Sequence, residues 1–337
     1  MTMESLTVLP EESESRLDHV LGRLLPEMGL RGRRRLCELG LVTVNARQAP
    51  ASRKMRTGDV VLVLSEKDSA KNGSAAPDEK SQAASSRPEN ARLFPEELPR
   101  LVRKYGHLAV LFKPASIHTE SLAGKPGTSL QALLPELLGG QTGVRLLNRL
   151  DFSTSGLTVA ALDEEGESLY RQAQENGQTT KRYLALLEGA LYRDMLATQK
   201  LILKNRSRVL VELAPHPDIR RHTNVQPLAV MDAAPLCGML KQYGWEGHPP
   251  TSVTLAGCTI LKGARHQIRA HCAALGFPLL GDRRYGAAFH PAEEAEETFF
   301  LHHGRLLLPG LDVSTLPPWL ALLDKNAARA AERWLKD

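Results

Sequence analysis

The feature that most constrains the fold is a polar, low-complexity stretch that interrupts the chain. Residues 68–90 read DSAKNGSAAPDEKSQAASSRPEN, which is rich in Ser, Ala, Gly, Pro and charge and has no aromatic or β-branched residue. Such a stretch cannot bury enough apolar surface to offset the entropy of ordering it, which is typical of a flexible linker. We therefore expect a small domain over residues 15–65, a linker over 66–92 and a second domain over 93–337.

The charge balance of the chain is mildly basic. Lys and Arg number 43 against 38 Asp and Glu, which gives a formal net charge of +5 and a pI near 9.0. No run approaches the roughly 18 apolar residues that a membrane-spanning helix needs, and the N-terminus is acidic, unlike that of a signal peptide. We therefore expect a cytoplasmic protein that does not associate with membranes.

The cysteines and histidines do not indicate a metal site. The four cysteines are Cys37, Cys237, Cys258 and Cys272, and no two of them stand at the two-residue spacing of a zinc knuckle or redox pair. His266 and His271 are five residues apart, which is a poor spacing for adjacent ligands on one helix face, and no cluster of carboxylates accompanies them. We expect neither structural zinc nor disulfides.

In the first segment, the apolar spacing predicts two helices followed by a small sheet. Leucines and a valine recur at helical spacing over residues 17–25, and a second short helix fits residues 33–39, closed by Gly40. Residues 41–45 and 60–64 have the composition of strands. This pattern predicts a small α/β domain.

The start of the second predicted helix is strongly basic. Arg31, Arg33, Arg34 and Arg35 cluster there, where guanidinium groups are able to contact successive phosphates. The alternative is an ordinary solvated basic face. The order of RLD, RRRLCELGLVTVN and TGDVVLVL resembles the small RNA-binding domain named after ribosomal protein S-four. The resemblance implies that these four arginines bind RNA.

In the second segment, apolar runs alternate with turns. Strand-like runs cover residues 108–112, 157–162, 183–187, 209–213 and 253–261, and residues 168–174 and 266–275 favour helices. This pattern predicts an α+β domain on a mixed, largely antiparallel sheet. No glycine-rich phosphate loop follows any of these runs, so no nucleotide cofactor is implied.

The most informative run is RLLNRLDFSTSGL, over residues 145–157. It places Arg149 and Asp151 among leucines, directly before a Ser/Thr/Gly turn and a predicted strand. A carboxylate in such a setting must be paired or functional, because burying it alone costs too much. From the residues alone, a salt bridge that pins the turn and a catalytic carboxylate are both open.

This run resembles the signature R-L-D-x-x-T-S-G-L of the RluA-type pseudouridine synthases, and further motifs follow in the family's order. They are LFKP from residue 111, KRYLA from residue 181, HQIRAH from residue 266, LGFPLLGD from residue 275 with Tyr285-Gly286, and LHH from residue 301. The resemblance spans roughly residues 108–309. So many ordered motifs make it specific.

The resemblance implies a cofactor-free isomerase that converts uridine within RNA to pseudouridine. It assigns Asp151 as the essential carboxylate, which either attacks the ribose at carbon 1 or removes a proton from the neighbouring carbon. Tyr183 is expected to lie against the uracil and is a candidate base for the proton on carbon 5. Arg269 is expected to pair with Asp151 and keep it ionised. A core tyrosine and a phosphate-binding arginine are the alternatives for these two residues.

Further residues are expected to bind the substrate. Arg149 is expected to reach the RNA backbone or to fill the gap left by an everted nucleotide. Lys113, His266 and Gln267 stand in the matching motifs and are expected to contact RNA, with ordinary packing as the alternative for the histidine. Ribosomal RNA is the expected substrate, transfer RNA is the alternative, and a monomer is the expected state.

Two positions depart from the family pattern. Asn148 stands where the family usually has a histidine before R-L-D, and Ala264 stands where it usually has an arginine. Asn148 can still donate and accept hydrogen bonds but carries no titratable charge. These departures keep open a protein that binds RNA without turnover. A hydrolase that releases uracil is disfavoured because the motif lacks a second acid.

Overall fold

The structure is a computed structural model of the chain and describes residues 2–26, 28–38, 42–44, 47–65, 97–121, 129–203, 209–293 and 295–337. It divides into two compact units, Met1–Ser86 and Arg87–Asp337. The whole of the predicted linker, over residues 66–92, lies outside the described residues, so the domain boundaries stay predictions. Within the described ranges, no helix has both the length and the apolar character needed to cross a bilayer.

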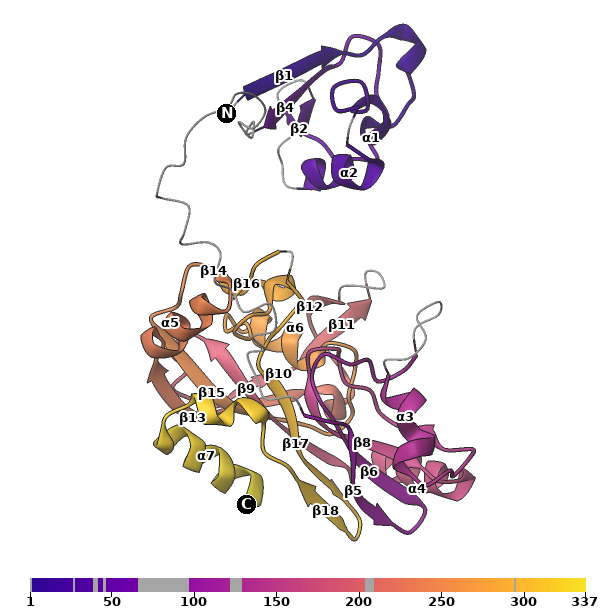
Figure 1. Cartoon of the computed structure of the whole chain (residues 1–337), viewed down its shortest axis with the longest axis vertical. Helices are drawn as coiled ribbons and strands as arrows, with labels where there is room; N and C mark the ends of the chain where they lie inside the picture. Colours follow the sequence, from indigo (N-terminus) through magenta and orange to yellow (C-terminus); the bar gives the residue numbers. More distant parts are fainter. Residues whose placement is uncertain are drawn as a thin grey trace, which may run out of the picture. The chain divides into compact units, whose positions relative to one another are not determined.

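The first unit has a four-stranded antiparallel sheet and two helices (Figure 1). Across the sheet, the strands are β1 (Thr2–Thr7), β4 (Val60–Ser65), β2 (Val42–Val44) and β3 (Arg47–Gln48), and the helices are α1 (Leu17–Val20) and α2 (Leu30–Glu38). Leu17 and Leu21 pack with Val42, Met55 and Val61 in a small apolar core. This core explains why short helices persist in so small a unit.

Two expectations for this unit need correction. The predicted helix over residues 17–25 ends at Val20, and the chain turns at Gly22, where a Cβ atom would lie 2.5 Å from Nη1 of Arg33. Glycine is also a poor helix former. Strand β1 was not predicted, although it pairs with β4 along its whole length. The predicted closing residue Gly40 lies outside the described residues.

The second unit is built on a ten-stranded mixed sheet (Figure 1). Across the sheet, the strands are β10 (Met195–Ala197), β13 (Thr223–Asp232), β15 (Ser252–Ile260), β9 (Thr180–Glu188), β17 (Leu301–Leu308), β8 (Ser155–Ala161), β6 (Leu108–Lys113) and β5 (Arg100–Tyr105), with β18 (Leu311–Ser314) beside β17 and β7 (Arg145–Leu146) beside β8. The β17–β8 pair is parallel and the other pairs are antiparallel. The predicted mixed, largely antiparallel sheet is confirmed.

Five α-helices and two separate two-stranded sheets complete the described part of this unit. The helices are α3 (Leu130–Leu137), α4 (Glu164–Glu175), α5 (Ala234–Gln242), α6 (Gln267–Ala274) and α7 (Lys325–Lys336), and the small sheets pair β11 (Gln199–Leu203) with β12 (Val209–Pro215) and β14 (Trp245–Gly247) with β16 (Phe289–Pro291). The predicted strand runs appear as β6, β8, β9, β12 and β15, and the predicted helices as α4 and α6. Helices α3, α5 and α7 were not predicted.

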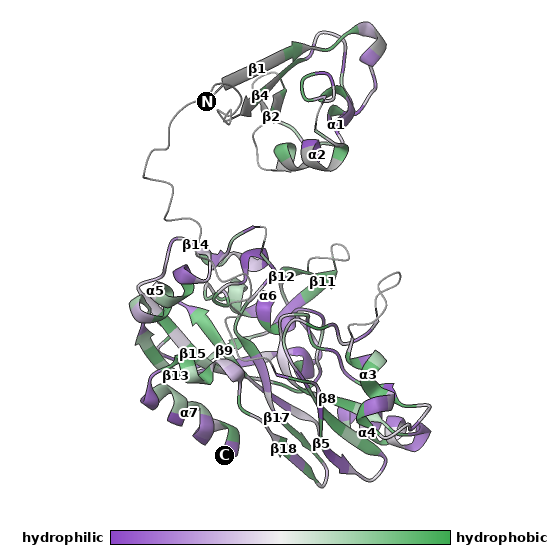
Figure 2. Cartoon of the chain, viewed as in Figure 1, coloured by the Kyte–Doolittle hydropathy of each residue, from purple (hydrophilic) through white to green (hydrophobic). Residues whose placement is uncertain are grey.

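The central strands are apolar and buried, and the helices that cover them are polar on their outer sides (Figure 2). In α7, Ala327, Ala331 and Leu335 recur every four residues and face the sheet. On β15, Gly257 leaves room for Trp334 of this helix, which a side chain there would overlap. Burial of this kind is the main driving force for assembling the layers.

One glycine allows the parallel pair in the middle of the sheet. Gly156 has a φ of 116°, and a Cβ atom on it would overlap the backbone of His303. Only glycine adopts this conformation and leaves this space without strain. It brings β8 against β17 directly after the loop that carries Asp151. The S-G-L part of the run therefore positions the loop that holds the carboxylate.

Candidate active site

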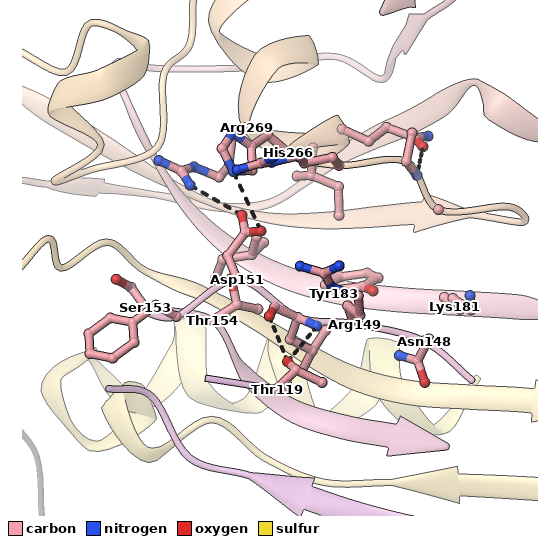
Figure 3. Close-up of a pocket in the computed structure, with 18 of the residues that line it drawn as sticks. Thr119, Asn148, Arg149, Asp151, Ser153, Thr154, Lys181, Tyr183, His266 and Arg269 are labelled. Carbon is pink, nitrogen blue, oxygen red and sulfur yellow. Dashed lines mark hydrogen bonds and ion pairs between the residues drawn. The ribbon is translucent and has the colours of Figure 1, made fainter. Parts of the chain in front are cut away.

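A pocket of about 800 Å³ opens over the middle of the sheet. Residues 118–121, 147–154, 260 and 262–269 line it, together with Gln174, Lys181, Tyr183, Arg284, Glu297, Phe299 and Leu301. Figure 3 shows that side chains from loops, from β9 and from the start of α6 meet there. The pocket gathers most of the residues that the sequence singled out in the second segment.

Asp151 lies in the loop between β7 and β8, with its carboxylate facing the pocket (Figure 3). Its Oδ2 accepts a hydrogen bond from Nη1 of Arg269 at 3.2 Å, and its Oδ1 lies 3.7 Å from Nε2 of His266. The predicted ion pair with Arg269 is therefore present. The Asp151 side chain is still 26% exposed, so the carboxylate is oriented while one oxygen stays open to the pocket.

Arg269 is a buried guanidinium at the first turn of α6, and its side chain is only 2% exposed. It donates to Oδ2 and Oδ1 of Asp282 at 2.6 and 2.8 Å and to Oε1 of Glu297 at 2.6 Å. Burial alone would lower the pKa of Arg269, but the hydrogen bonds and charges of Asp282, Asp151 and Glu297 raise it above its ordinary value. The guanidinium therefore stays charged and fixed in place.

Tyr183 projects from β9 into the same pocket and is almost completely buried. Its ring stacks on that of His303, with centroids 4.5 Å apart and planes 13° from parallel. Burial, Tyr170 and the charge of Asp151 raise the pKa of Tyr183. The phenol is therefore protonated near neutral pH, so it can accept a proton only after giving up its own.

His266 and Gln267 both line the pocket, but their polar atoms are held mainly by the protein. Nδ1 of His266 lies 2.8 Å from Oη of Tyr285, and burial lowers the pKa of His266 to about 4 despite the nearby charge of Asp151. The amide of Gln267 donates to the carbonyl oxygens of Arg221 and His222 and accepts from the backbone N–H of Ala264. The expected RNA contact by the Gln267 amide is therefore corrected to a support for α6.

Lys113 is a second correction. It was expected to contact substrate, yet its side chain is fully buried at the end of β6 and does not line the pocket. Its Nζ donates to the carbonyl oxygens of Pro114, Ile117 and Phe152 at 2.7, 2.9 and 3.3 Å, and burial lowers its pKa to about 7. Three carbonyl groups turn toward the ammonium, so it ties together the loops beneath Asp151.

Arg149 lies at the rim of the pocket and is largely exposed. Its Nη1 is 2.9 Å from Oε2 of Glu120, so it pairs with this residue. A salt bridge between Arg149 and Asp151 that pins the turn is therefore absent from the described contacts. The RNA contact expected of Arg149 stays a prediction.

The arginines of the first unit stand apart from this pocket in the sequence. Arg33 donates from Nε to the carbonyl oxygen of Met28 at 2.6 Å, and Arg34 donates from Nε to Oδ2 of Asp18 at 2.6 Å. The side chains of Arg31 and Arg35 lie outside the described residues. The RNA contacts predicted for these four residues stay predictions.

Comparison with known proteins identifies the family. Residues 107–274 match the family model described as RNA pseudouridylate synthase. An uncharacterized RNA pseudouridine synthase of Aquifex aeolicus (strain VF5) is 30% identical over 293 residues, which cover 84% of this chain and 80% of that protein. The chain belongs to the RNA pseudouridine synthases. The predicted enzyme class, an isomerase, is thereby confirmed.

Other relatives of this synthase carry more specific names. Ribosomal large subunit pseudouridine synthase D of Nitrosomonas europaea is 29% identical, over 83% of this chain and 72% of that protein. Human RNA pseudouridylate synthase domain-containing protein 1 is 31% identical, over 64% of this chain and 69% of that protein. A solved structure of human RNA Pseudouridylate Synthase Domain Containing 1 superimposes with a TM-score of 0.51 at 25% identity, covering 68% of this chain and 88% of that one.

The sequence analysis did not identify two carboxylates that bind Arg269. Asp282 stands in the LGFPLLGD motif, where an acid beside a glycine turn was a usable signal. Glu297 ends an acidic run that is typical of a solvated surface, and nothing in the sequence marks it.

Among the residues that the structure describes, no group of three or more His, Cys, Asp or Glu side chains is placed to hold a metal ion.

Proposed function

We propose that this synthase isomerises uridines of ribosomal RNA to pseudouridine, with Asp151 as the reacting carboxylate. The observation that carries the proposal is the open carboxylate of Asp151, held at the pocket by a buried, permanently charged Arg269. The name of the Nitrosomonas europaea relative supports ribosomal RNA as the substrate class. Transfer RNA is the alternative substrate.

The proposed reaction exchanges one bond for another and needs no cofactor. The bond between C1′ and N1 of the uridine breaks, and its electron pair stays with the uracil. Asp151 either bonds to C1′ or removes a proton from C2′, and the charge of its ionised carboxylate suits the electron-poor sugar that develops. The rotated uracil then bonds to C1′ through C5, as the bond from Asp151 to C1′ breaks or Asp151 returns its proton to C2′. The base loses the C5 proton and gains a proton on N1, so the composition is unchanged.

Tyr183 is proposed to pack against the uracil. Tyr183 lines the same pocket as Asp151 and lies two residues from Lys181 on the same strand, which supports this role. Its raised pKa weighs against the phenol as the first acceptor of the C5 proton. If Tyr183 takes that proton, it must pass its own proton on at the same time.

We also propose that the first unit is an S-four-type RNA-binding domain. The exposed guanidinium groups of Arg16 and Arg34 around Asp18 support contacts with phosphate. Tethering it to the second unit raises the local concentration of RNA at the pocket. A chain that begins after Lys67 should bind RNA more weakly and with a smaller salt dependence, while its rate at saturating RNA stays unchanged; an equal affinity and salt slope would refute this role.

The cellular setting completes the proposal. The protein is proposed to act as a monomer in the cytoplasm. Size-exclusion chromatography with light scattering at micromolar protein tests the monomer. A dimer at the lowest concentration measured would overturn it.

Release of tritium from RNA labelled at C5 of uridine tests the proposed function. Large-subunit ribosomal RNA should release tritium with the natural protein and not with Asp151→Asn, and transfer RNA should release little. Tight binding without release would instead identify a protein that binds RNA without turnover. Free uracil in the supernatant would identify a hydrolase, for which the second acid, Glu297, now lies in the pocket lining.

A further inference from the structure

The pocket contains a buried cation that the reaction described above does not use. Lys181 lies on β9, lines the pocket and is only 3% exposed. Its Nζ lies 5.6 Å from the centre of the Tyr170 ring, and in the described part of the chain no hydrogen-bond acceptor or carboxylate is placed to pair with it. Burying an ammonium group without such a partner is costly.

The strand register places Lys181 beyond Tyr183 as seen from Asp151. Tyr183 pairs with His303 and Lys181 pairs with Leu306, so the two residues lie at successive levels of the sheet. Both line the pocket, and residues two apart on one face of a strand are separated by about 6.6 Å. Figure 3 shows Lys181 on the far side of Tyr183 from Asp151.

A second unpaired donor lies at the same level. Gly156 of β8 pairs with His303, and β8 runs parallel to β17, so Val159 lies toward the Lys181 end. The backbone N–H of Val159 donates to Oδ1 of Asn148 at 2.7 Å, which leaves the Nδ2 group of Asn148 buried without a partner. This end of the pocket therefore carries donors in excess of acceptors.

The depth of Lys181 selects the part of RNA that can reach it. Backbone phosphates stay with the chain at the rim, where Arg149 and Arg265 are exposed. The everted base is the part that enters the pocket. With its ribose at Asp151 and its ring along Tyr183, the uracil presents its far edge, which carries O4, toward Lys181.

We propose that Lys181 is a further catalytic residue of this synthase, whose ammonium donates a hydrogen bond to O4 of the target uracil and stabilises the negative charge on the departing base. The inference rests on the proposed function. When the bond between C1′ and N1 breaks, its electron pair spreads over N1 and the carbonyl oxygens, and the lysine keeps its proton throughout. A fixed donor aimed at charge that develops during the reaction is an effective form of catalysis.

The protonation state of Lys181 agrees with this role. Burial lowers the pKa of Lys181 to about 8, which leaves the ammonium form dominant near neutral pH. The titratable groups nearest to it are phenols and a histidine: Tyr170 on α4, Tyr183 on β9 and His303 on β17. Burial and the charge of Lys181 lower the pKa of His303, so this neighbour is neutral as well.

Lys181→Met tests the proposal in the full chain, with Lys241→Met as the matched control, because Lys241 is an exposed lysine of α5 that does not line the pocket. Single-turnover tritium release at saturating RNA should fall about 10²-fold in Lys181→Met, with RNA affinity within twofold of the natural protein. Lys241→Met should keep both the RNA affinity and the saturated rate within twofold of the natural protein. Release by Lys181→Met within twofold of the natural protein would overturn the proposal.

A substrate substitution separates catalysis from a structural role. RNA with 4-thiouridine at the target replaces O4 by sulfur, a weak acceptor, so the ratio of natural to Lys181→Met rates should shrink at least fivefold. An unchanged ratio would show that Lys181 does not act on O4. Lys181→Gln gives the same comparison if the methionine variant does not fold. If the natural protein is active and Asp151→Asn is not, an active Lys181→Met refutes this inference alone; an inactive natural protein refutes the proposed function.

Discussion

Each unit of the molecule contains a cluster of arginines and carboxylates, and the two clusters are built in opposite ways. In the first unit the buried group is an acid: Asp18 is fully buried and accepts hydrogen bonds from Arg16 and Arg34, whose side chains are 45% and 48% exposed. In the second unit the buried group is a cation, the guanidinium of Arg269, and the three carboxylates around it differ in their exposure.

The difference shows how burial decides which group remains available. Burial alone would raise the pKa of Asp18, but its bonds to Arg16 and Arg34 lower it to about 2. This carboxylate is therefore ionised, and its partners are residues of the fold itself. The two arginines keep donors in solvent. Around Arg269, Asp282 takes the bidentate position and is fully buried, which leaves Asp151 with a single bond and an open oxygen. The first cluster exposes cations, and the second exposes a carboxylate.

The largest expected effect on stability comes from removing the buried guanidinium group of Arg269. Arg269→Met should lower the free energy of unfolding of the second unit by about 3–5 kcal/mol, because Asp282 would remain buried without a partner. Arg171→Met is the matched control, since it breaks an exposed pair with Glu167 that is worth about 0.5 kcal/mol. Urea denaturation followed by tryptophan fluorescence measures both. Equal losses in the two variants would contradict the account of the cluster.

Acid should unfold the second unit before the first. Burial lowers the pKa of His266 to about 4 and those of His302 and His303 to about 3. Between about pH 6.5 and pH 4 the unfolded chain binds protons that the folded unit does not, so stability falls as the pH falls. Three such groups contribute up to about 4 kcal/mol per pH unit. The stabilisation from Asp18 is instead lost only as the pH falls from about 4 toward 2.

The positions of the tryptophans make this measurable in the full chain. All three, Trp245, Trp319 and Trp334, belong to the second unit, so their fluorescence reports on that unit, whereas far-ultraviolet circular dichroism reports on both. The urea midpoint of the fluorescence transition should fall steeply as the pH falls from 7 to 6 and then to 5. His248→Gln, at an exposed position, should leave the slope unchanged. A midpoint independent of pH would mean that the buried histidines are already charged in the folded state.

A smaller effect is expected from the buried acid of the first unit. Asp18→Asn should destabilise that unit by about 1–3 kcal/mol, because an amide cannot satisfy two guanidinium groups. The tryptophan transition and the single-turnover rate at saturating RNA should not change. Hydrogen exchange of the backbone in residues 2–65 measures the local loss. A loss of turnover would show that the two clusters are coupled.

The smallest effect is expected at the rim of the pocket. Glu120→Gln removes the partner of Arg149, an exposed ion pair worth less than about 1 kcal/mol. The freed guanidinium should bind RNA about two- to fivefold more tightly, with a steeper salt dependence. Filter binding across a salt series gives both quantities. A weaker affinity would indicate that Glu120 itself orients Arg149 toward RNA.

The sequence predicted what depends on apolar runs and on ordered motifs. The β8 and β9 strands contain nearly all of the predicted apolar runs, and the Asp151–Arg269 pair joins two motifs that the fold brings together. Helix α7 was missed because its buried stripe is mostly alanine, which gives a weak apolar signal. Lys113 was misjudged because its place in the LFKP motif led to an expected RNA contact, whereas three carbonyl groups hold its ammonium group inside the fold.

The most direct test of the central claim compares the open carboxylate with its neighbour in the same cluster. The measurement is single-turnover tritium release by Asp151→Asn at saturating ribosomal RNA, with Glu297→Gln as the control because Glu297 also binds Arg269. We expect Asp151→Asn to lose about 10³-fold or more with RNA still bound, and Glu297→Gln to stay within about tenfold of the natural protein. A folded Asp151→Asn that releases tritium within tenfold of the natural rate would contradict the account.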